Sequence, residues 1–419
     1  MKKMLKHLSG NSLALWVIAV LSLTASMCDE DVVNQDVDNP PPAEETLSKN
    51  HTILLYIMAE NSLYGFAKND LNELEKGMES YLSDHANVVV FVDDRHLPRI
   101  LHYQRQKNHI VCDTVKTYEE DVCSVDPVVL QQVLDFTYNR YPARNYGLVM
   151  WSHGEGWRPA TSKAFSLPLQ QFIGIDNGSN STGNGGKQMD IEDLGNVLER
   201  YEDLRFVMFD ACFMQSVEVA YALRNSTEYL ISSPMEIPGP GAPYHELFTA
   251  CLNDDSIDVF KIAQNYYNYY QTRIENGNRT YGVALSVIKC DELVDLAKET
   301  KQLIATYIRK EQGDIDLNDI FVYDYRQVPI YYDLDDLMRT IAPYDEYQAW
   351  YHQLKRTVPY AMTTSFVYSE FVGNVSMHPE RFSGISTYIP KSQSRYTDLN
   401  EDFKQTEWYK DAGWGQTGW

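Results

Sequence analysis

Short apolar segments alternate with amphipathic segments between residues 52 and 233, and this alternation has the strongest consequence for the fold. Each apolar segment has the length of a buried strand, and each amphipathic segment repeats its apolar residues every three or four positions. The segments expected as strands are 52–60, 87–94, 99–104, 146–152, 205–210 and 228–233. Those expected as helices are 66–82, 127–141, 191–201 and 214–224. The pattern predicts an α/β fold, with a mostly parallel sheet between two layers of helices.

Residues 251–419 follow a less regular pattern, and no internal repeat is visible in them. Two segments have helical periodicity, 258–274 and 291–308. Two others are apolar runs of strand length, 280–288 and 382–390. We therefore expect a carboxyl-terminal α+β region that completes the sheet and packs on a core formed by residues 51–250.

The amino terminus is organised like an export signal. A basic segment (1–7) precedes an apolar segment (13–23) that is too short to cross a bilayer comfortably, and Cys28 follows. This order resembles a bacterial lipoprotein signal, in which residues 1–28 direct export and Cys28 becomes the lipidated first residue. Met27 departs from the small residue that usually precedes such a cysteine. The alternative is an ordinary secretory signal with an incidental cysteine.

Residues 29–50 are acidic, contain prolines and have few large apolar side chains. This composition predicts a disordered tether between the signal and the folded domain. The acidic run at 29–31 resembles the surface-export signal of some bacterial lipoproteins. The mature protein is therefore expected outside the cytoplasm, as an outer-membrane or cell-surface lipoprotein, or otherwise as a secreted or periplasmic protein.

The formal net charge of −23 at pH 7 argues against nucleic acid or an anionic membrane surface as a partner. We therefore expect no nucleic-acid partner, and contact with a membrane only through the lipid anchor. The same negative field favours cationic peptides.

The spacing of the cysteines indicates neither a definite disulfide pattern nor a metal site. Five follow Cys28, and an odd number outside the cytoplasm leaves at least one thiol unpaired within the chain. Cys112 and Cys123 bracket a short segment and could form a local disulfide. No cysteine or histidine cluster has zinc spacing, and the polar loop at 158–190 lacks EF-hand spacing. The sequence therefore predicts no metal site, and it implies no cofactor.

Two strand ends carry the residues with catalytic chemistry. His153 and Gly154 follow the strand expected at 146–152, and Cys212 follows the strand expected at 205–210. Because parallel strands end at one edge of a sheet, the imidazole and the thiol are expected to share one crevice. An imidazole can activate a thiolate nucleophile, and the amides of Gly154 and of Cys212, at a helix start, could form an oxyanion hole. Taken singly, each residue has an alternative role, as a packing cysteine or a hydrogen-bonded loop histidine.

The same two stretches resemble a known group of enzymes. An apolar strand followed by His-Gly, in "LVMWSHGEGW", and another followed by Ala-Cys, in "FVMFDACFMQSVEVAYAL", form the signature of the caspase-like cysteine peptidases. Within that group the chain resembles the clostripain family. The resemblance covers most of residues 52–244 and includes the stretch "YLISSPMEIPGPGAPY" at its end. The resemblance implies a caspase-like sandwich and a cysteine endopeptidase with a His153/Cys212 dyad. Its histidine would protonate the leaving group and polarise the scissile carbonyl.

The resemblance also implies an acidic pocket for the P1 side chain, because members of the family prefer arginine or lysine before the scissile bond. Asp210 occupies the matching position, and a carboxylate there would pair with a guanidinium or ammonium group. The alternative role of Asp210 is to cap the helix expected after it. Ser232 and Ser233 lie where pocket-wall residues are expected, and Glu236 could supply a second acid. The Gly-Trp-x-Tyr stretch of the family is replaced by "PMEIPGPGAPY", which keeps Tyr244.

Some members of the family are matured by cleavage in the loop between the histidine and the cysteine, and Lys163 is the candidate processing site here. The expected partner is a peptide or protein substrate of an exported cysteine endopeptidase. The competing hypothesis is a surface lipoprotein that binds peptides or proteins on the same fold without catalysis.

Overall fold

The computed structural model describes residues 49–83, 85–107, 109–157, 172–178, 186–252 and 256–419. The predicted signal with Cys28, the predicted tether up to residue 48 and the predicted processing site Lys163 lie outside the described residues. Within the described part, no helix combines the length and the apolar character needed to cross a membrane.

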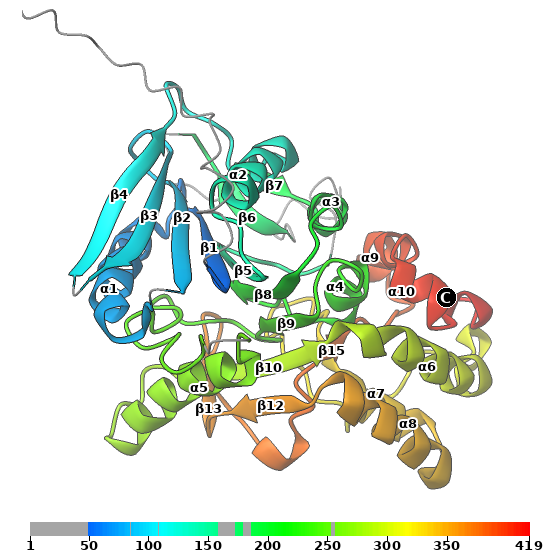
Figure 1. Ribbon diagram of the computed structural model, residues 1–419. Coiled ribbons are helices and arrows are strands. Elements are labelled where there is room, and N and C mark those ends of the chain that lie inside the picture. Colours follow the sequence, from blue (N-terminus) through cyan, green and yellow to red (C-terminus); the bar gives the residue numbers. More distant parts are fainter. Residues whose placement is uncertain (1–48, 84, 108, 158–171, 179–185, 253–255) are drawn as a thin grey trace, which may run out of the picture. The chain divides into compact units, whose positions relative to one another are not determined.

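A nine-stranded sheet organises the chain (Figure 1). Its central strands run parallel in the order β2-β1-β5-β8-β9. Their bounds are β1 (His51–Met58), β2 (Ala86–Asp93), β5 (Asn145–Trp151), β8 (Leu204–Asp210) and β9 (Tyr229–Ser232). Each corresponds to an expected apolar segment, and each is almost wholly buried. Helices cover both faces of such strands, which explains why their sequences are continuously apolar.

Antiparallel strands extend the sheet at both edges. β3 (Arg99–Gln106) and β4 (His109–Thr117) lie beyond β2, and β10 (Ala284–Lys289) and β12 (Tyr360–Thr363) lie beyond β9. The carboxyl-terminal region therefore completes the sheet, as expected. The sequence does not predict β4, because this edge strand is exposed or half-buried along its length and has no continuous apolar run.

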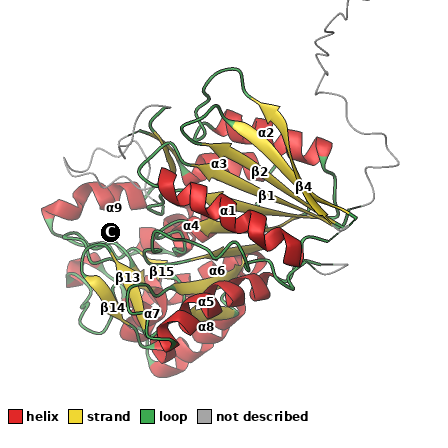
Figure 2. Cartoon of the chain, turned by 90° about the vertical axis from the view of Figure 1, so that its left-hand side faces the viewer, coloured by secondary structure: helices red, strands yellow, loops and turns green. Residues whose placement is uncertain are grey.

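Helices cover both faces of the sheet (Figures 1 and 2). α1 and α5 share a core with Ile53 and Leu55 of β1, whereas α2, α3, α4 and α6 share a second core with Leu54 and Tyr56. Alternate residues of one strand thus enter opposite cores, as the pleat requires. The helices are α1 (Tyr64–Tyr81), α2 (Pro127–Arg140), α3 (Ile191–Leu198), α4 (Val217–Ala222), α5 (Val259–Glu275) and α6 (Leu293–Tyr307). The predicted α/β/α sandwich is confirmed.

The remaining elements are short hairpins and helices. The paired strands are β6 (Ile173–Asp176) with β7 (Lys187–Met189), β11 (Tyr332–Asp333) with β15 (Ser386–Thr387), and β13 (Phe366–Ser369) with β14 (Gly373–Ser376). The helices are α7 (Leu334–Ile341), α8 (Tyr344–Thr357), α9 (Thr397–Phe403) and α10 (Glu407–Asp411). Single 3₁₀ turns occupy Cys290–Glu292, Lys310–Gln312, Pro379–Arg381, Ser394–Tyr396 and Trp414–Gln416.

The structure corrects the strand expected at 382–390, of which only β15 remains. Backbone groups of this run bond to the loop and helix around α4 rather than to a long partner strand. The Ser386 N–H donates to the carbonyl of Gln215, and the Tyr388 N–H donates to the carboxylate of Glu218. The apolar composition of this segment therefore correctly indicated that it is buried, but not that it forms a strand.

The disulfide considered between Cys112 and Cys123 is not formed, and all cysteines of the described residues are free thiols. Cys112 is the cross-strand partner of Tyr103, whose ring lies in the core beneath α1 and α5. Cys123 packs against the other core. Because cross-strand partners point to the same face, the sheet separates the two thiols.

Candidate active site

His153 and Cys212 follow the carboxyl ends of two adjacent strands, at matching positions. β5 and β8 are adjacent and parallel, and their last paired residues are Trp151 and Asp210. His153 and Cys212 each lie two residues beyond this pair, and both line one pocket of about 310 Å³. The expected shared crevice at the carboxyl edge of the sheet is therefore present.

Gly154 lets the histidine loop and the cysteine turn touch. A Cβ atom at this position would lie 2.8 Å from the Cβ of Ala211 and 2.9 Å from the carbonyl oxygen of Cys212. Both separations are too short for a real side chain, so this close approach requires glycine. Gly154 also forms a β-bridge with Ile173 of β6. The need for glycine is thus independent of any role for its amide.

The His153 ring is held by a residue that the sequence did not single out. The Nε2 atom lies 2.9 Å from the hydroxyl oxygen of Ser62, in the loop between β1 and α1. The carbonyl of His153 accepts a hydrogen bond of 2.9 Å from the Gly174 N–H of β6. Burial lowers the pKa of His153 to about 4, because a buried imidazole loses the hydration of its charged form. The ring is therefore neutral at pH 7.

Cys212 lies in a tight turn, and the helix that follows begins later than expected. Phe213 has a φ of +59°, a left-handed conformation that is uncommon outside glycine. The Phe213 N–H donates to the carbonyl of Met235, which holds this turn. α4 begins only at Val217, with the side chain of Ser216 as its cap. The expectation that the Cys212 amide lies at a helix start is therefore wrong, because the turn separates the two.

The Cys212 thiol contacts the backbone of Ile237. The Ile237 N–H donates to Sγ at 3.3 Å, and the thiol lies 3.8 Å from the Ile237 carbonyl oxygen. Burial raises the pKa of Cys212 to about 12, and the nearby carboxyls of Glu236 and Glu155 raise it further. The Ile237 N–H lowers the pKa of Cys212, by less than burial raises it but by more than either carboxyl raises it, and the Arg326 guanidinium lowers it least. No hydrogen bond joins the thiol to the His153 ring among the described residues, so the resting pair is a neutral thiol and a neutral imidazole.

We expect Cys212 to react slowly with iodoacetamide at neutral pH, and its rate to rise about tenfold per unit between pH 8 and pH 11. A pKa near 12 leaves only about one thiol in 1,000 ionised at pH 9, and only the thiolate reacts. Peptide-resolved mass spectrometry measures the rate at each cysteine separately. A rate plateau at Cys212 below pH 8 would instead indicate a resting thiolate paired with imidazolium.

The pocket is acidic. Three carboxylates line it, from Asp210, Glu236 and Glu370, and no lysine or arginine does so in the described part of the chain. Aromatic rings of Tyr281 and Tyr368 also line it. A pocket with this lining suits a cationic side chain with an apolar stem.

Asp210 is buried at the end of β8 and does not cap α4. Its Oδ2 atom accepts hydrogen bonds from the Ala242 N–H at 3.0 Å and the Tyr244 hydroxyl at 2.9 Å, and its Oδ1 atom accepts one from Tyr266 at 3.1 Å. The helix-capping alternative is therefore wrong, because Ser216 performs that role. Burial raises the pKa of Asp210, and the three hydrogen bonds oppose that shift.

The structure brings Glu236 to the pocket, but not Ser232 or Ser233. Glu236 is 5% exposed, and its Oε1 atom accepts a hydrogen bond of 3.0 Å from the Glu370 N–H. Ser232 and Ser233 are buried and are not among the residues that line the pocket. The Ser233 hydroxyl accepts from the Met235 N–H, so it shapes the segment that contacts the cysteine turn.

A segment of the carboxyl-terminal region joins the histidine loop to the cysteine turn. Glu155, in the histidine loop, is half-buried and forms an ion pair with the buried Arg326, whose guanidinium also pairs with Asp324 at 3.3 Å. The same guanidinium lies 4.7 Å from the ring centroid of Phe213, in the cysteine turn. Tyr331 stacks on Phe213 and donates a hydrogen bond to the carbonyl of Glu155. No local sequence signal marks these residues, because the contacts join distant segments.

The chain is similar to known cysteine proteases over most of its length. Clostripain from Hathewaya histolytica is 24% identical across 85% of this chain and 78% of its own length. A solved structure of a secreted C11 cysteine protease from Bacteroides thetaiotaomicron, in complex with an irreversible peptide inhibitor, is 36% identical. It superposes with a TM-score of 0.75 and covers 87% of this chain and 99% of that one.

A second structure, of an inactive zymogen C11 protease from Parabacteroides distasonis, is 29% identical and superposes with a TM-score of 0.75. It covers 87% of this chain and 98% of that one. The sequence model of the clostripain family matches residues 55–419, which is most of the chain and includes its carboxyl-terminal region. The chain therefore belongs to the clostripain family of cysteine peptidases.

Proposed function

We propose that this chain is an exported endopeptidase that cleaves after arginine or lysine, with Cys212 as the nucleophile and His153 as the acid/base. One observation carries the proposal. His153 and Cys212 each follow the last paired residues of the adjacent strands β5 and β8 by two positions, and both line the same acidic pocket. Membership of a cysteine peptidase family supports the chemistry of that pair.

In the proposed reaction, Cys212 Sγ attacks the carbonyl carbon of the scissile bond while its proton passes to the neutral imidazole of His153. The C–N bond then breaks, the proton passes to the departing amine, and an acyl thioester remains on Cys212. Water attacks this thioester, with His153 taking its proton and returning it to the sulfur. The amides of Gly154 and Cys212 are the proposed donors to the oxyanion.

The lining of the pocket supports a basic P1 preference. A guanidinium or ammonium group would exchange water for charge-assisted hydrogen bonds to Asp210 and Glu236, both of which are largely buried. An acidic P1 side chain would face three carboxylates and be rejected by repulsion.

The proposal extends to the organisation of the whole chain. Residues 1–28 would direct export and supply Cys28 for lipidation, and residues 29–50 would tether residues 51–250 and 251–419 to the membrane. The description of one relative as secreted supports export.

Cleavage at Lys163 is proposed as the maturation step, because this lysine follows the histidine loop and precedes β6. The description of another relative as an inactive zymogen supports maturation within the family.

Acyloxymethyl ketone peptides with lysine or arginine at P1 test the function directly. We expect a thioether between the probe and Cys212, found by mass spectrometry of the peptide that contains this residue, and no adduct with an aspartate probe. The matched control is protein whose Cys212 has been blocked beforehand. If none of the probes modifies Cys212 after loop cleavage, the non-catalytic binding hypothesis replaces this one.

A further inference from the structure

A loop of the carboxyl-terminal region, residues 321–333, reaches the active site and is closed at its base by backbone pairing. Val322 forms an antiparallel β-bridge with Tyr332. The Tyr323 N–H donates a hydrogen bond of 2.8 Å to the carbonyl of Tyr331. We call this segment the arginine loop, because Arg326 lies in its middle.

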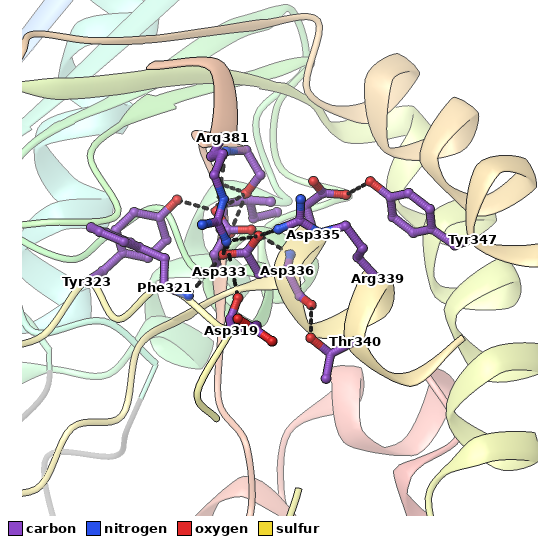
Figure 3. Close-up of polar contacts among 12 residues, drawn as sticks. Asp319, Phe321, Tyr323, Asp333, Asp335, Asp336, Arg339, Thr340, Tyr347 and Arg381 are labelled. Carbon is purple, nitrogen blue, oxygen red and sulfur yellow. Dashed lines mark hydrogen bonds and ion pairs between the residues drawn. The ribbon is translucent and has the colours of Figure 1, made fainter. Parts of the chain in front are cut away.

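Buried acids hold the base of the arginine loop (Figure 3). The carboxylate of Asp333 accepts a hydrogen bond from the Tyr323 hydroxyl, and that of Asp336 accepts one of 2.9 Å from the Phe321 N–H. Asp336 also pairs with Arg381 at 3.1 Å. These contacts fix where the loop begins and ends, and none of them involves the catalytic pair.

Arg326, at the far end of the arginine loop, is 7% exposed and contacts both loops that carry the catalytic pair. Its guanidinium pairs with Asp324 of its own loop at 3.3 Å and with Glu155 of the histidine loop. The same group lies 4.7 Å from the ring centroid of Phe213 in the cysteine turn, and 5.6 Å from that of Phe371. One buried charge therefore joins three segments that are distant in the sequence.

Tyr331 makes a second connection between the same two loops. Its ring stacks on Phe213 with the centroids 5.1 Å apart, and its hydroxyl donates to the carbonyl of Glu155. Phe213 directly follows Cys212, and Glu155 lies two residues after His153. The left-handed φ of +59° at Phe213 is a conformation that persists only where the surroundings hold it. The arginine loop thus contacts the chain within two residues of both catalytic groups.

The catalytic pair depends on these loops for its geometry. No hydrogen bond joins His153 to Cys212 among the residues that the structure describes, so their separation is set by the two loops. Neither Arg326 nor Tyr331 is among the described residues that line the pocket. Any effect of the arginine loop on the reaction must therefore pass through the loops that it contacts.

We propose that Arg326 is a positioning residue, which holds the histidine loop and the cysteine turn at the separation that thioester formation requires. A guanidinium suits this role, because its edge can pair with carboxylates while its face lies on an aromatic ring. The carboxyl-terminal region then contributes to catalysis as well as completing the sheet. This inference rests on the proposed function, since it concerns the reaction of Cys212 with a peptide.

Arg326→Met in the mature chain tests the inference with two measurements. We expect kcat for an arginyl reporter peptide to fall about 100-fold, because a small displacement of reacting groups has a large effect on rate. KM should stay within about threefold, because the residues that line the pocket are unchanged. Labelling of Cys212 by iodoacetamide, which needs the thiol but not the imidazole, should also stay within about threefold.

The expectation for iodoacetamide follows from the charge of Glu155. Burial raises the pKa of this acid to about 7, and Arg326 opposes that shift. When the guanidinium is lost, Glu155 takes up a proton at neutral pH, so the net charge near the thiol changes little. A purely structural role of Arg326 predicts a different result, because a loosened cysteine turn would expose the thiol and change its labelling as well.

Two milder variants make the test independent of the folding of Arg326→Met. Arg326→Lys keeps a positive charge near Glu155 but lacks the planar fork, so it should restore kcat to within about tenfold of the parent. Tyr331→Phe keeps the stacking on Phe213 and removes only the hydrogen bond to Glu155, so it should lower kcat by about threefold to fivefold.

Arg339→Met is the matched control. Arg339 is exposed and pairs with Asp336 at the base of the arginine loop, and Asp336 keeps its pair with Arg381 in this variant. The same chemical change should therefore leave kcat within about twofold.

Thermal melting and circular dichroism establish which variants are folded. A folded Arg326→Met with kcat within threefold of the parent overturns the inference, and so does a change in iodoacetamide labelling as large as the change in kcat. If Arg326→Met is unfolded, parental kcat in both Arg326→Lys and Tyr331→Phe overturns it. A parent protein whose Cys212 reacts with no lysyl or arginyl acyloxymethyl ketone contradicts the proposed function itself, and this inference with it.

Discussion

Cys212→Ala is expected to lower kcat/KM for an arginyl reporter peptide by about 10⁴-fold or more. Without Sγ no thioester can form, and His153 can act only as a general base for direct attack by water on the scissile carbonyl. The substitution removes the sulfur atom with its two contacts to the Ile237 backbone and leaves a smaller methyl group, without adding a polar or strained group. The fold should therefore persist, and the measured loss reports chemistry.

Cys112→Ala is the control for this prediction. Cys112 is an exposed thiol on the edge strand β4, at the opposite end of the sheet from β9, so its removal should leave kcat/KM within about twofold. Circular dichroism and thermal melting of all three proteins establish that they are folded. Residual activity of Cys212→Ala above about 1% of the parent would show that another group performs the nucleophilic step.

Asp210→Asn is expected to lower kcat/KM for arginyl and lysyl reporters by about 100-fold. This corresponds to about 2.8 kcal/mol, the scale of one or two hydrogen bonds to a charged group in a desolvated pocket. The amide keeps the volume of the carboxylate, and its oxygen can still accept from the Ala242 N–H. The Tyr266 hydroxyl can reverse its role and accept from the new NH₂ group.

Two other pocket acids serve as comparisons for Asp210. Glu370 is exposed, so Glu370→Gln should change kcat/KM by no more than about threefold. Glu236 is buried and already accepts the Glu370 N–H, so Glu236→Gln should have an intermediate effect of about tenfold. Labelling of Cys212 by iodoacetamide should be unchanged in Asp210→Asn and Glu370→Gln, and it should be faster in Glu236→Gln because the Glu236 carboxyl raises the pKa of the thiol. A large loss in Glu236→Gln with none in Asp210→Asn would transfer the role of P1 recognition to Glu236.

Much of the fold follows from the local pattern of the sequence. The five parallel strands are continuously apolar because both of their faces are covered, and this pattern is visible without any partner in view. The same reasoning failed at two places. It did not predict the edge strand β4, and it predicted a long strand where only the two-residue β15 forms. At an edge, pairing needs no apolar run, and in the region of β15 an apolar run is buried without a long partner strand.

The site was predictable only in part. His153 and Cys212 follow recognisable strands, so their common edge could be deduced from the parallel order alone. The contacts of Ser62 with the imidazole and of Ile237 with the thiol could not be deduced. Each joins a loop to another loop, and the path of a loop depends on the rest of the fold.

The sequence by itself determined the sandwich, the strand ends that carry the thiol and imidazole, and the family to which the chain belongs. Only the tertiary structure decided that Asp210 lines a pocket instead of capping a helix, and that Arg326 joins the histidine loop to the cysteine turn. The physical reason is the range of the interactions. Strand and helix patterns arise between near neighbours in the chain, whereas the electrostatics of buried acids depend on the distant segments that surround them.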